Sequence, residues 1–372
     1  MLILLLINLL ILALVVWNTR AWPAPSANGK TCAETCSILI PARNEEENLG
    51  DCLDSAMRQG NPVVEIIVCN DHSEDATAEI VENYNKIDPR IRMINASGLP
   101  EGWCGKNFAC ALLAAEARGD WMLFLDADAR LSPDAVSCMM AEAGQRDCTL
   151  LSSWPGLVLE SAWERALMPM LNFLVFTLFP APLSLRRDDP SLGLAHGACI
   201  LVKRTEYEAT GGHWLVFDKI FEDTELARAW RASGRHGFCL DGQDLVRVRM
   251  YDSLGGIWQG FQKNIFPAFS RAFSFWLFLG FHAACFLTPF AILPWLAMGY
   301  WRLWPLGVSA LCILLMRALQ AQRFRYPAWS VLVHPLAEVM LIAIGLSSWW
   351  SFQVGRGVSW KGRVYVRSCR RE

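Results

Sequence analysis

The sequence has 13 cysteines but no C-x-x-C pair and no cysteine spacing of the kind that binds zinc. A disulfide framework would show paired cysteines, and 13 is an odd number. We therefore expect reduced, mostly buried thiols. This pattern excludes a zinc module and a disulfide-stapled scaffold.

The chain also lacks an excess of basic charge. It carries 34 Lys and Arg against 36 Asp and Glu, a formal net charge of −2. Proteins that bind nucleic acid usually present a strongly basic patch or stripe. Nucleic acid is therefore not expected among its partners.

Apolar residues are abundant instead, at 53% of the chain with 17 Trp and a mean hydropathy of +0.24, and they gather at both ends. The first 17 residues, MLILLLINLLILALVVW, are long enough for a short membrane span. No basic residue precedes them, whereas Arg20 and Lys30 follow, which predicts an anchor with the rest of the chain in the cytoplasm. A cleaved secretory signal is the alternative, because PAPSA resembles a processing site, but a basic leading segment is missing.

The second apolar region runs from about Phe273 to Trp350 and holds candidate spans at 275–300, 303–316 and 329–350. The basic residues on both sides of the last span favour the cytoplasm, and one full crossing cannot leave both there. These residues are Arg317, Arg323 and Arg325 before it and Arg356, Lys361, Arg363, Arg370 and Arg371 beyond it. Either the last segment is a re-entrant hairpin, or an earlier segment does not cross.

Between the apolar ends, apolar strands alternate with helices. Three segments, 36–57, 65–84 and 119–143, each combine a strand, an acidic turn and a helix. Three such units in sequence predict a doubly wound parallel sheet. Its carboxyl edge, where ligands bind in such sheets, would gather Asp71, Asp126 and Asp128.

The D-x-D pair follows the apolar run LFL and is the first candidate ligand site. Two carboxylates suit Mg²⁺ or Mn²⁺, especially when phosphates complete the coordination. The alternative for this motif taken alone is a surface turn that caps the helix beginning at Ser132-Pro133.

Five stretches, SILIPARNEEENL, VCNDHSEDAT, LFLDADA, HGACILVKRTEYEATGGH and FEDTELA, occur in an order that resembles family 2 glycosyltransferases of the GT-A fold. GLPEGWCGKNFAC and RMYDSLGGIWQGFQKN are similar to the membrane-bound lipid branch with its carotenoid- and hopanoid-associated enzymes. The resemblance covers nearly the whole chain. It implies a GT-A-like doubly wound mixed sheet, an inverting transfer, a Mg²⁺ or Mn²⁺ cofactor, a nucleotide-sugar donor, first of all a UDP-sugar, and a membrane-lipid acceptor.

On the donor side, the resemblance implies roles for eight residues. Pro41, Ala42, Arg43 and Glu45 would line the nucleotide pocket, Asp71 would contact the base or ribose, Lys106 the phosphates or sugar, Asp126 the ribose or sugar, and Asp128 the metal. The alternatives are a solvated turn for Arg43 and Glu45 and an exposed helix-start lysine for Lys106.

On the acceptor side, the resemblance implies that Asp223 takes the proton of the acceptor hydroxyl, with Glu222 beside it. Capping of the following helix is the alternative for Asp223. Gly211-Gly212 resembles the acceptor-side turn of the family, and we expect structural or acceptor-lining roles for His196 and His213 rather than metal ligation.

Many membrane relatives carry a Q-x-x-R-W signature, but here the corresponding place reads WQGFQKN. Trp258 would replace its aromatic residue, and Lys263 would replace its arginine near the diphosphate. Loss of the signature favours transfer of a single sugar. The alternatives are a processive polysaccharide synthase and a non-catalytic membrane protein that binds nucleotides.

The expected organisation has five parts in an integral protein of the cytoplasmic membrane. They are an anchor at 1–17, a GT-A domain at 35–252 facing the cytoplasm, an interfacial segment at 253–272, a transmembrane region at 273–350 and a basic tail at 351–372. The apolar stretch 163–183 is expected along the membrane interface, where Phe173 and Phe176 would admit a lipid. A buried core helix is the alternative.

Overall fold

The computed structural model describes residues 1–25, 33–269, 271–354, 358–360 and 363–365. The chain divides into two compact units. The helical unit comprises 1–22, 159–182 and the chain from Tyr251 onward, and the sheet unit comprises 23–158 and 183–250. Lys30 and the basic residues Arg356, Lys361, Arg370 and Arg371, on which the charge argument partly rests, lie outside the described residues.

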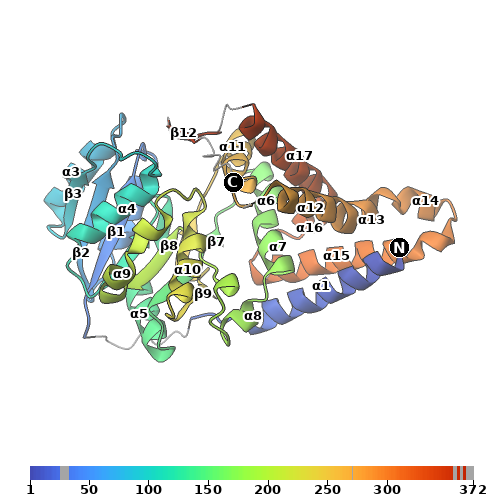
Figure 1. Ribbon diagram of the computed structural model, residues 1–372, viewed down its shortest axis with the longest axis horizontal. Coiled ribbons are helices and arrows are strands. Elements are labelled where there is room, and N and C mark those ends of the chain that lie inside the picture. The colour runs from blue at the N-terminus through green and yellow to red at the C-terminus, as the bar shows by residue number, and fades with distance from the viewer. Residues whose placement is uncertain (26–32, 270, 355–357, 361–362, 366–372) are drawn as a thin grey trace. The chain divides into compact units, whose positions relative to one another are not determined.

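A seven-stranded sheet in the order β3-β2-β1-β4-β8-β6-β9 forms the centre of the sheet unit (Figure 1). Only β8 runs antiparallel to its two neighbours, β4 and β6. The strands are β1 Cys36–Ala42, β2 Val63–Asn70, β3 Ile91–Asn95, β4 Trp121–Leu125, β6 Leu150–Trp154, β8 Cys199–Lys203 and β9 Gly237–Asp241. The predicted mixed, doubly wound sheet is confirmed.

Smaller elements complete the sheet unit. A three-stranded sheet joins β5 Ala129–Leu131, β10 Val246–Val248 and β7 Gly156–Leu157. The helices are α2 Leu49–Met57, α3 Thr77–Ile87, α4 Gly105–Glu116, α5 Ala135–Gln145, α9 Arg204–Thr210 and α10 Glu222–Ala232, with short 3₁₀ turns η1 Pro190–Leu192 and η2 Gly212–Val216.

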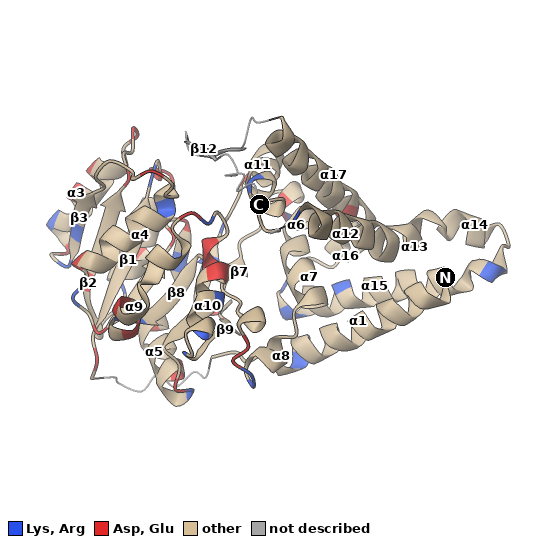
Figure 2. Ribbon diagram, viewed as in Figure 1, with Lys and Arg blue, Asp and Glu red and all other residues tan. Residues whose placement is uncertain are grey.

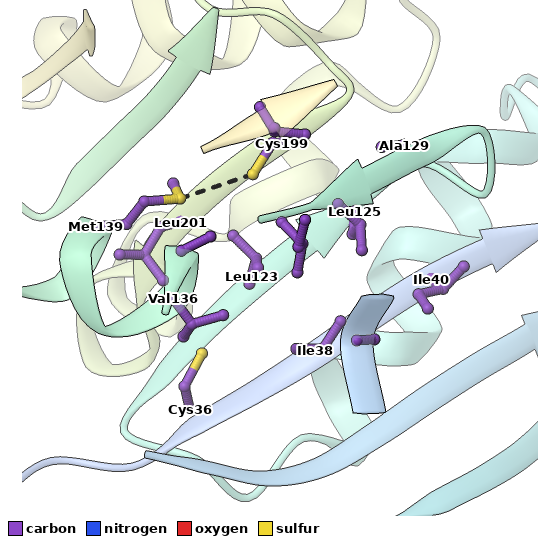
Figure 3. Packing of buried hydrophobic residues seen from close by; sticks show 14 of the residues in the cluster. Cys36, Ile38, Ile40, Leu123, Leu125, Ala129, Val136, Met139, Cys199 and Leu201 are labelled. Atoms are coloured by element: carbon purple, nitrogen blue, oxygen red, sulfur yellow. Dashed lines mark hydrogen bonds between the residues drawn. The ribbon is translucent and has the colours of Figure 1, made fainter. Parts of the chain in front are cut away.

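The central strands are buried on both faces, which explains their unbroken apolar runs. In β1, Ile38 and Ile40 belong to one hydrophobic cluster and Leu39 to the other. Figure 3 shows the first cluster, where Leu123 and Leu125 of β4 lie with Ile38 and Ile40. This rigid double-sided packing fixes the strand ends, and therefore the loops that follow them.

All eleven cysteines among the described residues are buried free thiols. Burial raises the pKa of thiols such as Cys36, so they stay protonated. The expectation of reduced thiols is confirmed for these eleven, and Cys32 and Cys369 lie outside the described residues.

The helical unit contains four helices that are long and apolar enough to cross a membrane, at Leu2–Ala21, Ala272–Ala297, Trp301–Arg323 and His334–Gln353. Figure 2 shows few charged residues along α1 and α15. The elements are α1 Leu2–Ala21, α6 Ala162–Leu167, α7 Pro169–Leu178, α8 Ala181–Ser184, α11 Leu254–Ile265, α12 Ala272–His282, the π-helical turn η3 Ala283–Leu287, α13 Thr288–Ala291, α14 Leu293–Ala297, η4 Trp301–Leu303, α15 Trp304–Arg323, α16 Trp329–Leu332 and α17 His334–Gln353. Beyond α17 come the short strands β11 Val358–Trp360 and β12 Arg363–Tyr365.

Helices α1 and α15 run side by side in the same direction. The first residues of α1 and the start of α15 line one common pocket. At their other ends, the Arg323 guanidinium donates to the carbonyls of Thr19 and Trp22 at 2.9 and 3.0 Å. Arg20 and Arg323 therefore lie at the same end of the helical unit.

Helix α17 runs antiparallel to α12. Trp349 packs on Trp276 with ring centroids 5.2 Å apart, while Glu338 pairs with His282 at 2.7 Å. The span at Ala272–Ala297 begins with α12, and its other end lies beside the start of α15. A Cβ added to Gly307, near the start of α15, would lie 2.8 Å from Leu296, near the end of that span. The end of α17 therefore returns to the end that holds Arg323. Within the helical unit, Arg323 and the end of α17 lie at one end, which is the arrangement that the expected re-entrant alternative requires.

The prediction that 163–183 lies along the membrane interface was wrong for Phe173 and Phe176, the residues expected to admit a lipid. Phe173 and Phe176 are 0% and 1% exposed, and α7 packs against α1 and α15 within the helical unit. Phe173 lies between Phe286 and His334, with ring centroids 4.9 Å from each. The alternative of a buried helix holds, and the segment 159–182 packs with the helical unit although the expected domain 35–252 included it.

Candidate active site

The carboxyl ends of β2, β1 and β4 lie next to one another in the sheet, and the candidate donor residues follow them. Asp71 comes directly after β2, and its backbone N–H donates to the Ala42 carbonyl at 2.8 Å. The Arg43 guanidinium donates to the Asp71 carbonyl at 2.6 Å. These three predicted donor residues are therefore brought together, with Pro41 one step back in β1.

The turn after β1 is tied to the loop after β2. The Glu45 backbone N–H donates to the Thr77 hydroxyl at 2.8 Å, and the Asn44 N–H donates to the Ser73 hydroxyl at 3.0 Å. Hydrogen bonds between the two loops hold both of them in place, so Arg43 and Glu45 have fixed positions at the sheet edge. A freely solvated turn, the alternative for these two residues, would lack such bonds.

Lys106 joins the D-x-D motif to Glu222 and Asp223, which we call the E-D pair. Its ammonium lies 2.8 Å from an Asp126 carboxylate oxygen and 2.9 Å from Glu222. Burial alone would lower the pKa of Lys106, but the charges of Asp126 and Glu222 raise it well above its usual value. The lysine is therefore a fixed positive charge between two carboxylates that are distant in sequence.

Asp223 lies beside this triad, in the first turn of α10. Its carboxylate accepts the backbone N–H of Gly197 at 2.8 Å and that of Thr224 at 2.6 Å. Burial, followed by the charge of Glu222, raises the pKa of Asp223 to about 7. The cap position of α10 belongs to Phe221, so Asp223 is not the helix cap. A carboxylate that titrates near neutrality suits proton transfer.

Gly197 is a residue of this site that the sequence analysis did not identify. A Cβ on this glycine would meet Lys106 Nζ at 3.0 Å, Asp223 Oδ2 at 3.4 Å and Glu222 Oε1 at 3.6 Å. The missing side chain lets three charged groups converge on one backbone segment. The signal was a glycine two positions before the apolar strand at 199–203, inside the motif HGACILVK.

The chemistry of the D-x-D motif fits a divalent cation. Lys106 pairs with Asp126, which leaves Asp128 as the acid of the motif that would hold a metal. Among the described residues no group of three His, Cys, Asp or Glu side chains could hold a metal alone. Mg²⁺ commonly binds through one or two carboxylates and takes further oxygens from substrate phosphates. The cap of α5 is Asp134 rather than either acid of the motif, so the capping alternative does not hold.

Gly211 and Gly212 form a left-handed turn after α9, with φ of +90° and +52°. The turn brings His213 back to Tyr207, whose hydroxyl lies 2.7 Å from His213 Nδ1. Burial lowers the pKa of His213 to about 4 and that of His196 to about 3, so both are neutral at neutral pH. The contact with Tyr207 supports a structural role for His213, one of the two roles expected, and the role of His196 stays a prediction.

The two glycines should respond differently to alanine. A Cβ on Gly212 would lie 2.0 Å from the Tyr207 ring, whereas a Cβ on Gly211 meets nothing within 4 Å. Gly211→Ala should cost about 1 to 2 kcal/mol for the left-handed backbone. Gly212→Ala should cost about 1 to 3 kcal/mol more because of overpacking. Thermal unfolding of the purified variants checks this, and equal midpoints would contradict the packing of Tyr207 on the turn.

Lys263 lies on α11 of the helical unit. Its role near the diphosphate stays a prediction. The residues of the sheet unit described above form the candidate site by themselves.

Comparisons with known proteins point in the same direction. Residues 37–210 match the family described as Glycosyl transferase family 2. The 4,4'-diaponeurosporenoate glycosyltransferase of Staphylococcus aureus (strain USA300) is 27% identical over 342 residues, which are 88% of each chain. The enzyme of the same name from Staphylococcus haemolyticus (strain JCSC1435) is 30% identical over 224 residues, or 59% of this chain and 58% of that one.

Among solved structures, the mannosyltransferase PcManGT from Pyrobaculum calidifontis, in complex with GDP-Man and Mn²⁺, superposes with a TM-score of 0.54. It is 18% identical, and the match covers 94% of this chain and 99% of that one. At this identity the likeness concerns the fold alone.

Proposed function

The chain is a family 2 glycosyltransferase related to the carotenoid-associated ones, and from this premise we propose that it transfers a single sugar, with inversion, from a nucleotide sugar to a membrane lipid. The observation that carries the proposal is the bridge of Lys106 between Asp126 and Glu222, at 2.8 and 2.9 Å. The bridge brings Asp126, a proposed donor acid, close to Glu222, which directly precedes the proposed proton acceptor Asp223. A scaffold that only binds nucleotides would not require a proton acceptor such as Asp223 beside this bridge.

In the proposed reaction, the acceptor oxygen attacks the anomeric carbon of the donor sugar. The bond from that carbon to the diphosphate oxygen breaks, and the nucleoside diphosphate leaves with the electron pair. The acceptor proton passes to the Asp223 carboxylate, which its pKa of about 7 keeps largely ionised at slightly alkaline pH.

The remaining residues bind and orient the donor. Ala42, Arg43 and Asp71 hold the nucleoside at the ends of β1 and β2, and Asp126 orients the sugar. Asp128 would hold a Mg²⁺ or Mn²⁺, which when bound neutralises charge on the departing diphosphate. Lys106 adds a fixed positive charge on the same side.

A UDP-sugar is the first donor to test, and a lipid with a hydroxyl or carboxyl group is the proposed acceptor. The lipid class agrees with the name of the S. aureus relative, 4,4'-diaponeurosporenoate glycosyltransferase. A processive synthase is the less favoured alternative, because it needs enough crossing helices to enclose a polymer, and the described chain has four helices that are long and apolar enough to cross.

Purified full-length protein, incubated with a panel of nucleotide sugars, Mn²⁺ and a membrane-lipid extract, should form a lipid that is heavier by one sugar residue. Mass spectrometry of the extract identifies both donor and acceptor. A ladder of products would indicate the processive alternative. Absence of both donor hydrolysis and transfer across the panel would contradict the proposed function.

We further propose that the sheet unit faces the cytoplasm of an inner membrane. The unit follows the end of α1 that carries Arg20. Native cysteines cannot report this, since Cys69 and Cys104 are buried. With Cys32 and Cys369 replaced, Glu82→Cys on α3 should resist an impermeant maleimide in intact cells, whereas Met298→Cys, 70% exposed in the native protein at the other end of the helical unit, should react. The reverse labelling pattern would overturn the orientation.

A further inference from the structure

Beside the charged site, the sheet unit exposes a cluster of large apolar side chains. Trp214, Leu215, Phe217 and Phe221 are 64%, 45%, 37% and 36% exposed. Trp103 packs edge-on against Trp214, with ring centroids 4.6 Å apart, and lies 5.6 Å from Phe217. We name these five side chains the aromatic face. Contiguous apolar surface of this kind usually marks a binding site.

Hydrogen bonds fix the aromatic face to the catalytic elements. The Cys104 N–H donates to the Phe217 carbonyl at 2.8 Å. The Asn107 side-chain amide, buried in α4, donates to the carbonyls of Val216 and Lys219 at 2.6 and 2.9 Å. Asn107 directly follows Lys106, so the same turn of α4 holds both the bridge and the aromatic face.

The aromatic face is also continuous in sequence with the proton-accepting acid. Phe221 directly precedes Glu222 and Asp223, and Trp103 stands three residues before Lys106. An acceptor that presents its hydroxyl to Asp223 must place the rest of its body on neighbouring surface. A water-soluble acceptor would gain nothing from the exposed rings of Trp214, Phe217 and Phe221 there, whereas a hydrocarbon chain would bury apolar surface against them.

We propose that the aromatic face binds the hydrocarbon body of the acceptor lipid and so makes the enzyme select apolar acceptors. This inference rests on the proposed function, because it concerns the acceptor of the same site. Trp214 is the main contact, as the most exposed ring of the face. Trp103 packs against Trp214 and also contacts Phe217.

The test uses the full-length protein in detergent micelles and in lipid nanodiscs, with a long-chain acceptor and a short-chain analogue that has the same head group. Trp214→Ser should raise the KM for the long-chain acceptor about tenfold, the effect expected when one large apolar contact is partly lost. The kcat, the KM of the short-chain analogue and donor hydrolysis should stay within twofold. Trp214→Phe should restore most of the affinity.

Ile87→Ser is the matched control, because Ile87 is 68% exposed on α3 of the same unit, away from the aromatic face in sequence. It should change none of these parameters. A KM rise for both acceptors that appears only in nanodiscs would overturn the proposal in favour of a bilayer contact. A change of oligomeric state in Trp214→Ser would overturn it in favour of a self-association surface.

Two further outcomes separate this inference from the proposed function. If wild type transfers sugar to lipid and Trp214→Ser behaves like wild type, the aromatic face does not bind the acceptor, although the function stands. If wild type hydrolyses the donor but transfers to no lipid, the function itself fails. Equal loss of hydrolysis and transfer in Trp214→Ser would assign the tryptophan to the folding of the site and overturn the inference.

Discussion

Replacing Asp223 with asparagine should lower the turnover on a hydroxyl acceptor by about 10²- to 10⁴-fold, the usual contribution of a positioned proton acceptor. Asparagine keeps the size of the side chain but cannot take a proton, and its single carbonyl oxygen can accept only one of the N–H groups of Gly197 and Thr224, which bond to different carboxylate oxygens of Asp223. The donor should still bind with nearly native affinity, because the loss falls on the chemical step. Single-turnover transfer, paired with titration of a nucleoside diphosphate, measures both quantities.

The pH profile gives an independent check of the same role. The pKa of Asp223 is raised to about 7, so its carboxylate form is lost as the pH falls below that value. Transfer to a hydroxyl acceptor should therefore rise with pH and reach half its maximum near pH 7. A carboxylic acid acceptor is ionised without help at neutral pH and should show neither this profile nor the full loss in the variant.

Asp218→Asn is a suitable control, because Asp218 is exposed in the same segment and pairs only with Lys219 in the contacts described. It should turn over like wild type. If Asp223→Asn also kept native turnover on a hydroxyl acceptor, Asp223 would be a structural acceptor of two backbone N–H groups. The base would then have to be sought among other residues.

Replacing Asp128 with asparagine should have the opposite signature. Loss of a carboxylate ligand should weaken donor binding by about 10²-fold or more when Mn²⁺ is present, since a bound metal contributes several kcal/mol. Without metal, wild type and variant should bind the nucleoside diphosphate alike. Isothermal titration with and without Mn²⁺ makes this comparison directly.

The control for Asp128 is Asp134→Asn. Asp134 is exposed and adopts a left-handed backbone with φ of +60°, which asparagine tolerates well. The Asp134→Asn variant should bind the donor with the same affinity as wild type. Equal donor affinities for wild type and Asp128→Asn in Mn²⁺ would contradict the metal role and leave Asp128 without a function in donor binding.

Stability should depend on buried polar groups that the sequence places inside apolar helices. His282 and Glu338 are both fully buried and pair at 2.7 Å between α12 and α17. Arg317 donates to the carbonyls of Pro169 and Ser330 at 3.0 and 3.2 Å. In an apolar surrounding such groups require partners, so these contacts fix how α17 packs against α12 and how α15 packs against its neighbours.

The sequence by itself determined the sheet and the identity of the acids. Apolar runs that end in polar turns can be read locally, because a strand buried on both faces needs unbroken apolar residues. This predicted β1, β2 and β4 and placed Asp71 and Asp126 at one edge. The order of the motifs then indicated a role for Glu222 and Asp223. No local pattern distinguishes these two residues from acids at the start of a helix.

Only the tertiary structure decided how these residues meet and which apolar stretches pack inside. Lys106 and Glu222 are 116 residues apart, yet they pair at 2.9 Å because α4 and α10 converge on the backbone at Gly197. The stretch 163–183 has the composition of an interfacial helix, but its fate depended on whether other helices cover Phe173 and Phe176. Composition specifies that a side chain avoids water, whereas the packing of distant segments specifies what replaces the water.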